Sequence, residues 1–299
     1  MALEIVEHAG WPENVRLANE QIELIITKNV GPRVIRFGFI GGPNIFGTFE
    51  DQLGKSGEDE WMIRGGHRLW VAPEAKPWSY ELDNTDVQIE QQADGAVTAG
   101  LPKGPITGIA KTMQIALAPD ANVVTVTHTL KNEGAKPVVS AVWALTVMAK
   151  RGLGIIPLPI KQSHENALLH NQEWSIWAYT DFSDPRWTLG ARYVTLRQDP
   201  ARSATKLGVA HREGWIGYLL DGYLFVKRFE RVPDARYPDG GVNFETFTNE
   251  EILELESLGP LGTLEPGQSA THQEQWELFK DVPDCANEDE LDEHVRSRL

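Results

Sequence analysis

The sequence is poor in features that would each point to a particular class of protein. It has a single cysteine, Cys285, so no disulfide can form within the chain and no paired-cysteine metal site is present. No stretch approaches the roughly 18 consecutive apolar residues of a membrane span, and the N-terminus has no basic segment followed by an apolar one. We therefore expect a cytoplasmic protein.

Basic residues are also scarce, since 28 Lys and Arg stand against 43 Asp and Glu and give a net charge of −15. Such a surface repels a phosphate backbone unless one face is locally basic, and no run of Lys or Arg would supply that face. The same repulsion acts at an anionic membrane. The sequence thus predicts neither a nucleic-acid partner nor a membrane partner, and it indicates no oligomeric state.

The chain is rich instead in short segments that have the pattern of β-strands. Residues 122–130 alternate threonines with Val126, His128 and Leu130, and Val138–Met148 is a nearly continuous apolar run, typical of a strand buried on both faces. Turn signals such as Asp221-Gly222 separate the segments. Strands are expected at residues 21–27, 34–39, 86–91, 109–117, 122–130, 138–148, 193–197, 214–220, 223–229, 243–248, 252–258 and 272–278. This spacing predicts an all-β sandwich or barrel.

A single domain is the simplest organisation of these strands. Hydrophobic residues make up 41% of the 299 residues, which suffices for a substantial core, and no repeat or low-complexity linker divides the chain. We expect one β-sandwich domain over residues 1–280. Asn287 and Glu290 form a plausible capping pair, so residues 281–299 are expected to be a tail with one exposed helix over 288–296.

The first candidate for chemistry is the segment 62–74, whose Gly65-Gly66 pair lets the backbone approach a ligand closely. It supplies donors, an acceptor and a group that titrates near neutrality: Arg64, His67, Arg68 and Glu74. Trp70 and Trp78 flank the cluster, and a flat indole ring can cover the apolar face of a pyranose. A turn with a solvated salt-bridge cluster is the alternative, but the tryptophans favour a functional site.

The second candidate is the glutamate-rich stretch 250–267. On a strand Glu254 and Glu256 share one face, whereas Leu253, Leu255 and Ser257 take the other. Two like charges about 7 Å apart would raise the pKa of at least one carboxyl if water were excluded, and a base could be poised near neutrality in this way. The alternative is an ordinary solvent-facing side of a sheet, which these residues alone favour.

The sequence has no motif that is typical of a cofactor-binding or metal-binding site. No glycine-rich dinucleotide loop or phosphate loop occurs. His164 and His170 lie six positions apart, so on a helix they would point to different faces and could not hold a zinc ion together. We expect neither a cofactor nor a metal.

The two candidate segments resemble known sugar-converting proteins. Leu255-Glu256-Ser257, followed by residues 264–268, resembles the end of aldose 1-epimerases, where a Leu-Glu-Thr strand carries the catalytic base. Residues 63–66 resemble the Ile-Arg-Gly-Gly segment of hexose-6-phosphate epimerases, and residues 31–35 resemble an early strand of the same superfamily. Over residues 20–280 the chain is similar to an uncharacterised bacterial branch of the galactose-mutarotase-like superfamily.

This resemblance implies a large two-sheet antiparallel sandwich whose concave face binds sugar, here with a short C-terminal helix. In active epimerases a histidine protonates the ring oxygen and a glutamate removes the proton of the anomeric hydroxyl; Glu256 matches that glutamate. The histidine belongs to a middle strand, and the matching segment Val142–Thr146 has none. His67 from another loop, or His128 from a neighbouring strand, could replace it.

Three functions remain open. The first is an aldose or hexose-phosphate 1-epimerase-like isomerase, with Glu256 as base and His67 as acid. The second is a non-catalytic carbohydrate-binding module, which the missing histidine favours. The third is a glycosidase or lyase-like enzyme, although two carboxyls on one strand are poorly placed for it. The expected partner is a small-molecule sugar or sugar phosphate, and the expected substrate-binding residues are Arg64, Arg68, Trp70, Glu74, Lys227 and Glu254, with Lys227 on a strand between Phe225 and Phe229.

Overall fold

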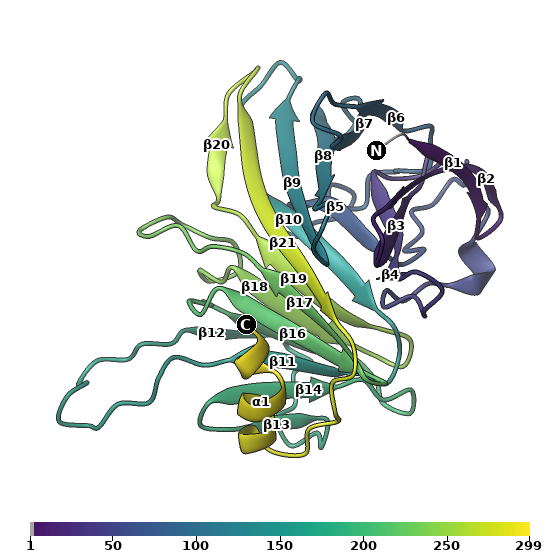
Figure 1. Cartoon of the computed structure of the whole chain (residues 1–299). Coiled ribbons are helices and arrows are strands. Elements are labelled where there is room, and N and C mark those ends of the chain that lie inside the picture. Colours follow the sequence, from purple (N-terminus) through teal and green to yellow (C-terminus); the bar gives the residue numbers. More distant parts are fainter. Residues whose placement is uncertain (1–2) are drawn as a thin grey trace.

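Two large antiparallel sheets pack face to face in the computed structural model, which describes residues 3–299 (Figure 1). One sheet has eleven strands and the other has ten. The predicted all-β, two-sheet sandwich is therefore confirmed. The first two residues of the expected 1–280 domain lie outside the described part of the chain.

The first sheet carries the candidate site. Its strands are β1 (Glu4–His8), β2 (Trp11–Ala18), β3 (Ile22–Ile26), β4 (Arg33–Phe39), β5 (His67–Ala72), β10 (Val138–Met148), β12 (Trp174–Ile176), β15 (Thr205–Val209), β18 (Phe244–Thr248), β19 (Leu253–Leu258) and β20 (Gly262–Leu264). They run in the order β1-β2-β3-β4-β5-β10-β19-β18-β15-β12, and β20 pairs with β10 beside this path. The sequence predicts no strand at β5. Part of the first candidate segment, which was expected to be a loop, therefore belongs to the sheet.

The second sheet closes the sandwich from the other side. Its strands are β6 (Gln88–Gln91), β7 (Val97–Leu101), β8 (Ile109–Leu117), β9 (Val123–Asn132), β11 (Leu153–Pro157), β13 (Trp187–Leu189), β14 (Tyr193–Arg197), β16 (Trp215–Leu220), β17 (Tyr223–Arg228) and β21 (Ser269–Phe279). They run in the order β13-β14-β11-β16-β17-β21-β9-β8-β7-β6. Short 3₁₀ turns occur at η1 (Glu50–Gln52) and η2 (Arg296–Arg298).

The main core lies between the sheets and draws aromatic rings from both. Phe37 of β4 packs against Trp276 of β21 with ring centroids 5.8 Å apart, and against Phe225 of β17 at 6.1 Å. In β9 Val124, Val126, His128 and Leu130 are buried while the threonines between them are half-buried, as the alternation predicts. Such aromatic contacts between the sheets hold the two layers at a fixed spacing.

The central strand β10 is buried on both faces, as its continuous apolar sequence predicts. Val142 and Met148 belong to the core between the sheets. Trp143 and Leu145 point the other way and form a second apolar cluster with Trp70 on the outer face of the first sheet. This outer cluster makes the floor of the candidate site.

The C-terminal tail forms the short helix α1 (Glu288–His294), and the side chain of Asn287 caps its N-terminus by accepting from the backbone N–H groups of Asp289 and Glu290. The helix was expected to be exposed. Instead Leu291 is buried, and it packs in a cluster with Tyr193 on the outer face of the second sheet, where Figure 1 shows α1 beside β14. In the part of the chain that the structure describes, no helix has the length and apolar character needed to cross a membrane.

Candidate functional site

The candidate site lies on the outer face of the first sheet, where strand alternation brings side chains of β5, β10 and β19 together. Leu145 of β10 pairs with Arg68 on one side and with Glu256 on the other. Because adjacent residues of a strand point to opposite faces, Arg68 and Trp70 share this outer face with Glu254 and Glu256. Three neighbouring strands thus present charged groups over an apolar floor.

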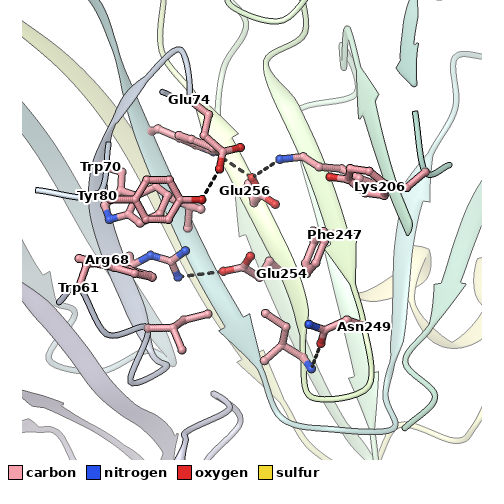
Figure 2. A pocket seen from close by; sticks show the side chains of 15 residues that line it. Trp61, Arg68, Trp70, Glu74, Tyr80, Lys206, Phe247, Asn249, Glu254 and Glu256 are labelled. Atoms are coloured by element: carbon pink, nitrogen blue, oxygen red, sulfur yellow. Dashed lines mark hydrogen bonds and ion pairs between the residues drawn. The ribbon is translucent and has the colours of Figure 1, made fainter. Parts of the chain in front are cut away.

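These side chains line a cleft of about 230 Å³. Its lining residues are Trp61, Ile63, Arg68, Trp70, Glu74, Tyr80, Trp143, Leu145, Tyr179, Lys206, Phe247, Asn249, Ile252, Glu254 and Glu256. In Figure 2 Arg68 and Lys206 approach the two central glutamates from opposite sides. Aromatic rings beside a few convergent polar groups are the usual composition of a small-molecule site.

Arg68 forms one side of the cleft and is paired with Glu254. Its Nη1 donates to Glu254 Oε1 at 2.8 Å. The guanidinium lies over the ring of Trp70 at 4.7 Å and over that of Trp61 at 5.3 Å. Rings on this cation add cation–π attraction and hold the guanidinium in one orientation.

Lys206 forms the other side and was missed in the sequence because β15 was not predicted. Its Nζ lies 2.6 Å from Glu245 Oε2 and 3.2 Å from Glu256 Oε2. Burial alone would lower the pKa of Lys206, but Glu256 and Glu245 together raise it above its ordinary value. Glu245 and Glu256 are direct partners across β18 and β19, so the ammonium screens two carboxylates that would otherwise repel each other.

Glu256 is the most deeply placed acid that lines the cleft, with an exposed fraction of 1%. Its Oε2 accepts from Trp143 Nε1 at 3.0 Å and from Lys206, whereas its Oε1 has no hydrogen-bond partner among residues 3–299. Burial raises the pKa of Glu256 despite Lys206, and Glu254 adds to the rise. Burial likewise raises the pKa of Glu245, because one ammonium cannot neutralise two buried carboxylates.

The rim of the cleft is formed by Glu74 and Tyr80, and the Tyr80 hydroxyl donates to Glu74 Oε1 (Figure 2). Burial, followed by the charge of Glu74, raises the pKa of Tyr80. The phenol therefore stays protonated at neutral pH and serves as a hydrogen-bond donor. Trp61 packs edge-on against Tyr80 with ring centroids 5.5 Å apart, which continues the aromatic wall to the rim.

His67 does not reach the cleft, because it precedes Arg68 on β5 and so points into the space between the sheets. Its Nε2 lies 2.7 Å from His128 Nε2, and its Nδ1 lies 2.8 Å from Thr146 Oγ1. His128 Nδ1 must donate to the carbonyl of His272, so its Nε2 accepts from His67. Burial lowers the pKa of both histidines, consistent with two neutral rings linked in a chain.

Lys227 also lies between the sheets and not in the cleft. Its Nζ contacts Glu274 at 2.8 Å and donates to the carbonyl of Leu255 at 3.0 Å. Burial lowers the pKa of Lys227. Burial opposes the ionised form of Glu274, but Lys227 and the nearby histidines hold its pKa well below the ordinary value. We call this set, His67, His128, Thr146, Lys227, Ser257, His272 and Glu274, the inner network.

Part of the inner network has the composition of a metal site. Ligand atoms of His67, His128 and Glu274 all lie within 4.8 Å of one another. The two facing imidazole nitrogens already share one hydrogen bond, and the carboxylate accepts from Ser257 and Trp276 in addition to its pairing with Lys227. Because these lone pairs already accept hydrogen bonds, and because the ammonium of Lys227 would repel a metal ion, the arrangement favours a hydrogen-bonded core over a cation site.

Arg64 is fully buried beside the cleft and takes no part in its lining. Its guanidinium pairs with Glu58, and its backbone N–H donates to Gln52 Oε1 at 2.8 Å.

The structure therefore brings together five of the eight residues expected to form the site, Arg68, Trp70, Glu74, Glu254 and Glu256, and places Arg64, His67 and Lys227 elsewhere. Of the segment 142–146 the residues at the cleft are Trp143 and Leu145, and none of the cleft's lining residues is a histidine.

Comparison with known proteins agrees with this architecture. Residues 82–279 match a protein family described as a domain of unknown function (DUF4380). No curated protein matches the chain. Among solved structures, a galactose mutarotase-like protein from Lactobacillus casei is similar with a TM-score of 0.59 and 11% identity, over 89% of this chain and 100% of that one.

Two further solved structures share the fold. A putative aldose 1-epimerase from Escherichia coli has a TM-score of 0.55 and 12% identity, over 89% of this chain and 99% of that one. A galactose 1-epimerase from Lactobacillus acidophilus has a TM-score of 0.51 and 10% identity, over 93% of this chain and 98% of that one. The resemblance to the galactose-mutarotase-like fold is thereby confirmed.

Proposed function

The chain belongs to the DUF4380 family and has the galactose mutarotase-like fold, and we propose that it binds a monosaccharide in the cleft lined by Arg68, Trp70 and Glu256. The observation that carries this proposal is the free oxygen of Glu256. Its Oε1 is buried and has no partner in the described part of the chain, and an unpaired buried acceptor costs about 1–3 kcal/mol. A ligand hydroxyl that donates to this oxygen would recover that free energy.

The other groups of the cleft fit a sugar ring. The indole rings of Trp61 and Trp70 offer flat apolar surfaces for the C–H face of a pyranose. Glu74 at the rim and Glu254 beside Arg68 provide further acceptors for hydroxyl groups. Alternating apolar and polar groups of this kind match a ligand with one apolar face and a hydroxylated edge.

Titration calorimetry with a panel of monosaccharides tests the proposal. We expect Glu256→Gln and Trp70→Ala to weaken binding about tenfold or more, since each removes a contact worth about 1.5–3 kcal/mol. Glu251→Gln is the matched control, because Glu251 is exposed at the β18–β19 turn and pairs only with Lys150. If no monosaccharide binds at millimolar concentration, the proposal is wrong.

Anomer exchange is a second candidate, favoured by the position and the raised pKa of Glu256. A carboxylate with a raised pKa is a better base for the anomeric hydroxyl. The proton donor for the ring oxygen is the weak point, because Tyr80 and Lys206 both have raised pKa values and hold their protons at neutral pH. Binding without turnover is therefore the better-supported function. NMR exchange spectroscopy on bound sugars decides: faster exchange than in buffer, lost in Glu256→Gln, would establish the isomerase.

A further inference from the structure

The charges at the cleft are unequal in number. Two cations, Arg68 and Lys206, face four carboxylates at or directly behind the lining: Glu74, Glu245, Glu254 and Glu256. Three of the four carboxylates are buried, so water screens them poorly. In an empty cleft the acidic groups therefore outnumber the basic groups by two, and burial disfavours the ionised forms of Glu245 and Glu256 unless a cation binds.

Both cations of the cleft are already paired with carboxylates and lie against aromatic rings. Arg68 is held between Glu254 and two indole rings, and Lys206 lies between Glu245 and Glu256 with the rings of Trp143 and Trp177 at 5.0 and 4.8 Å. A phosphate group near either cation would lie beside the carboxylates that already pair with that cation, and their negative charge would repel it. The cleft thus opposes an anionic ligand.

An unpartnered carboxylate oxygen calls for a donor in the ligand, while Arg68 Nε and the indole nitrogens of Trp61 and Trp70 call for an acceptor such as a sugar oxygen. Glu256 Oε1 belongs to a side chain of the cleft wall, and Glu245 Oε1 lies directly across the strand pair. Both are buried, and neither has a hydrogen-bond partner among the residues that the structure describes. A sugar hydroxyl would satisfy one such oxygen. An ammonium would satisfy it more strongly, because it adds positive charge to the donated hydrogen bond and favours the ionised form of the carboxylate.

From these observations we infer that the cleft selects a sugar that carries a protonated amine, and that it rejects phosphorylated sugars. The amine contacts Glu256 and the ring stacks on the indoles, so the inference rests on the proposed sugar-binding function and specifies its ligand. The net charge of −15 acts in the same direction, because it attracts a cationic sugar to the protein and repels a sugar phosphate.

Calorimetry with matched ligands tests the inference. The panel consists of glucosamine and galactosamine, their N-acetyl forms, glucose, galactose and glucose 6-phosphate, at low and at moderate salt. We expect the amino sugars to bind about tenfold or more tightly than the N-acetyl and parent sugars, with a preference that weakens in salt, and no measurable binding of the phosphate.

The outcomes separate the inference from the function on which it rests. If neutral sugars bind as tightly as amino sugars, or if the phosphate binds as tightly, the inference is overturned while sugar binding stands. If no member of the panel binds, the proposed function fails and the inference fails with it.

Two variants locate the preference at the proposed carboxylate. Glu256→Gln should bring the ratio of amino-sugar to neutral-sugar affinity towards one, whereas Glu251→Gln, outside the cleft, should leave the ratio as in wild type. Should Glu256→Gln fail to fold, Glu74→Gln at the exposed rim provides a second measurement with a smaller expected fall in the ratio. A ratio unchanged in both variants would contradict the assignment.

Discussion

The two faces of the first sheet carry polar clusters of opposite character, although β5, β10 and β19 contribute to both; the rest of the inner network comes from the second sheet. On β19 Glu256 faces the cleft and Ser257, the next residue, faces the inner network. Among the described residues, no buried side-chain atom of the inner network lacks a hydrogen-bond partner, whereas Glu256 Oε1, Arg68 Nε and the indole nitrogens of Trp61 and Trp70 in the cleft do. Buried polar groups that satisfy one another stabilise a fold, and buried polar groups left unpaired are suited to a ligand.

The largest effect expected from this comparison is loss of stability in Lys227→Met. The substitution leaves Glu274 ionised, fully buried and without its closest cation. Breaking a buried pair on one side costs about 3–5 kcal/mol, and urea unfolding measures it. Lys150→Met, at an exposed pair, is the control and should change the free energy of unfolding by less than about 1 kcal/mol.

A double variant sharpens this prediction. Lys227→Met combined with Glu274→Gln removes both charges, so it should lose less stability than Lys227→Met alone. A Lys227→Met protein as stable as wild type would show that the inner network is not structural and would remove the contrast between the two faces.

The second effect is a loss of stability on acidification. Burial lowers the pKa of His272 to about 3 in the folded protein, so below the unfolded value of 6.5 the unfolded chain binds a proton that the folded protein does not. Stability from His272 is therefore complete above pH 6.5 and falls by about 1.4 kcal/mol per pH unit below it. The lowered pKa of Glu274 acts in the same sense below pH 4.5.

Glu256 and Glu245 oppose this trend. Their pKa values are raised in the folded state, so above pH 4.5 the folded protein takes up protons more readily than the unfolded chain, and acidification stabilises it there. Urea unfolding between pH 7 and pH 4 should nevertheless show a net decrease, with a flatter slope in His272→Gln. His170→Gln, at an exposed histidine, should keep the wild-type slope. Identical slopes in all three proteins would contradict the assignment of neutral buried histidines.

Strand alternation explains how much of the site could be predicted from the sequence. Glu254 and Glu256 were placed together correctly, because β19 was recognised as a strand and its period of two fixes their common face. The sequence predicts His67 and Arg68 in one site because its local pattern indicates a loop, and not a strand, at residues 67–72. Once β5 is a strand, the same period separates His67 from Arg68.

Other features depend on contacts that local pattern does not encode. Lys206 meets Glu256 only because β15 follows β18 and β19 in the sheet, an order set by long-range pairing. The burial of Arg64 depends on Glu58 and on Gln52 of η1, which precede it in the chain and belong to no strand. Short strands such as β12, β13 and β20 have three residues each, too few to show a period.

The smallest expected effect on stability, and the sharpest test of the comparison, is Glu256→Gln. Burial raises the pKa of Glu256, so its ionised form is disfavoured in the folded state, and Lys206 keeps Glu245 as a partner at 2.6 Å when the charge of Glu256 is removed. The amide also retains an oxygen that can accept from Trp143. We expect the free energy of unfolding at pH 7 to fall by less than about 1 kcal/mol or to rise, while the affinity for sugar decreases. A loss as large as that of Lys227→Met would mean that Glu256 holds the fold together, as the inner network does, and that its unpaired oxygen has no ligand to meet.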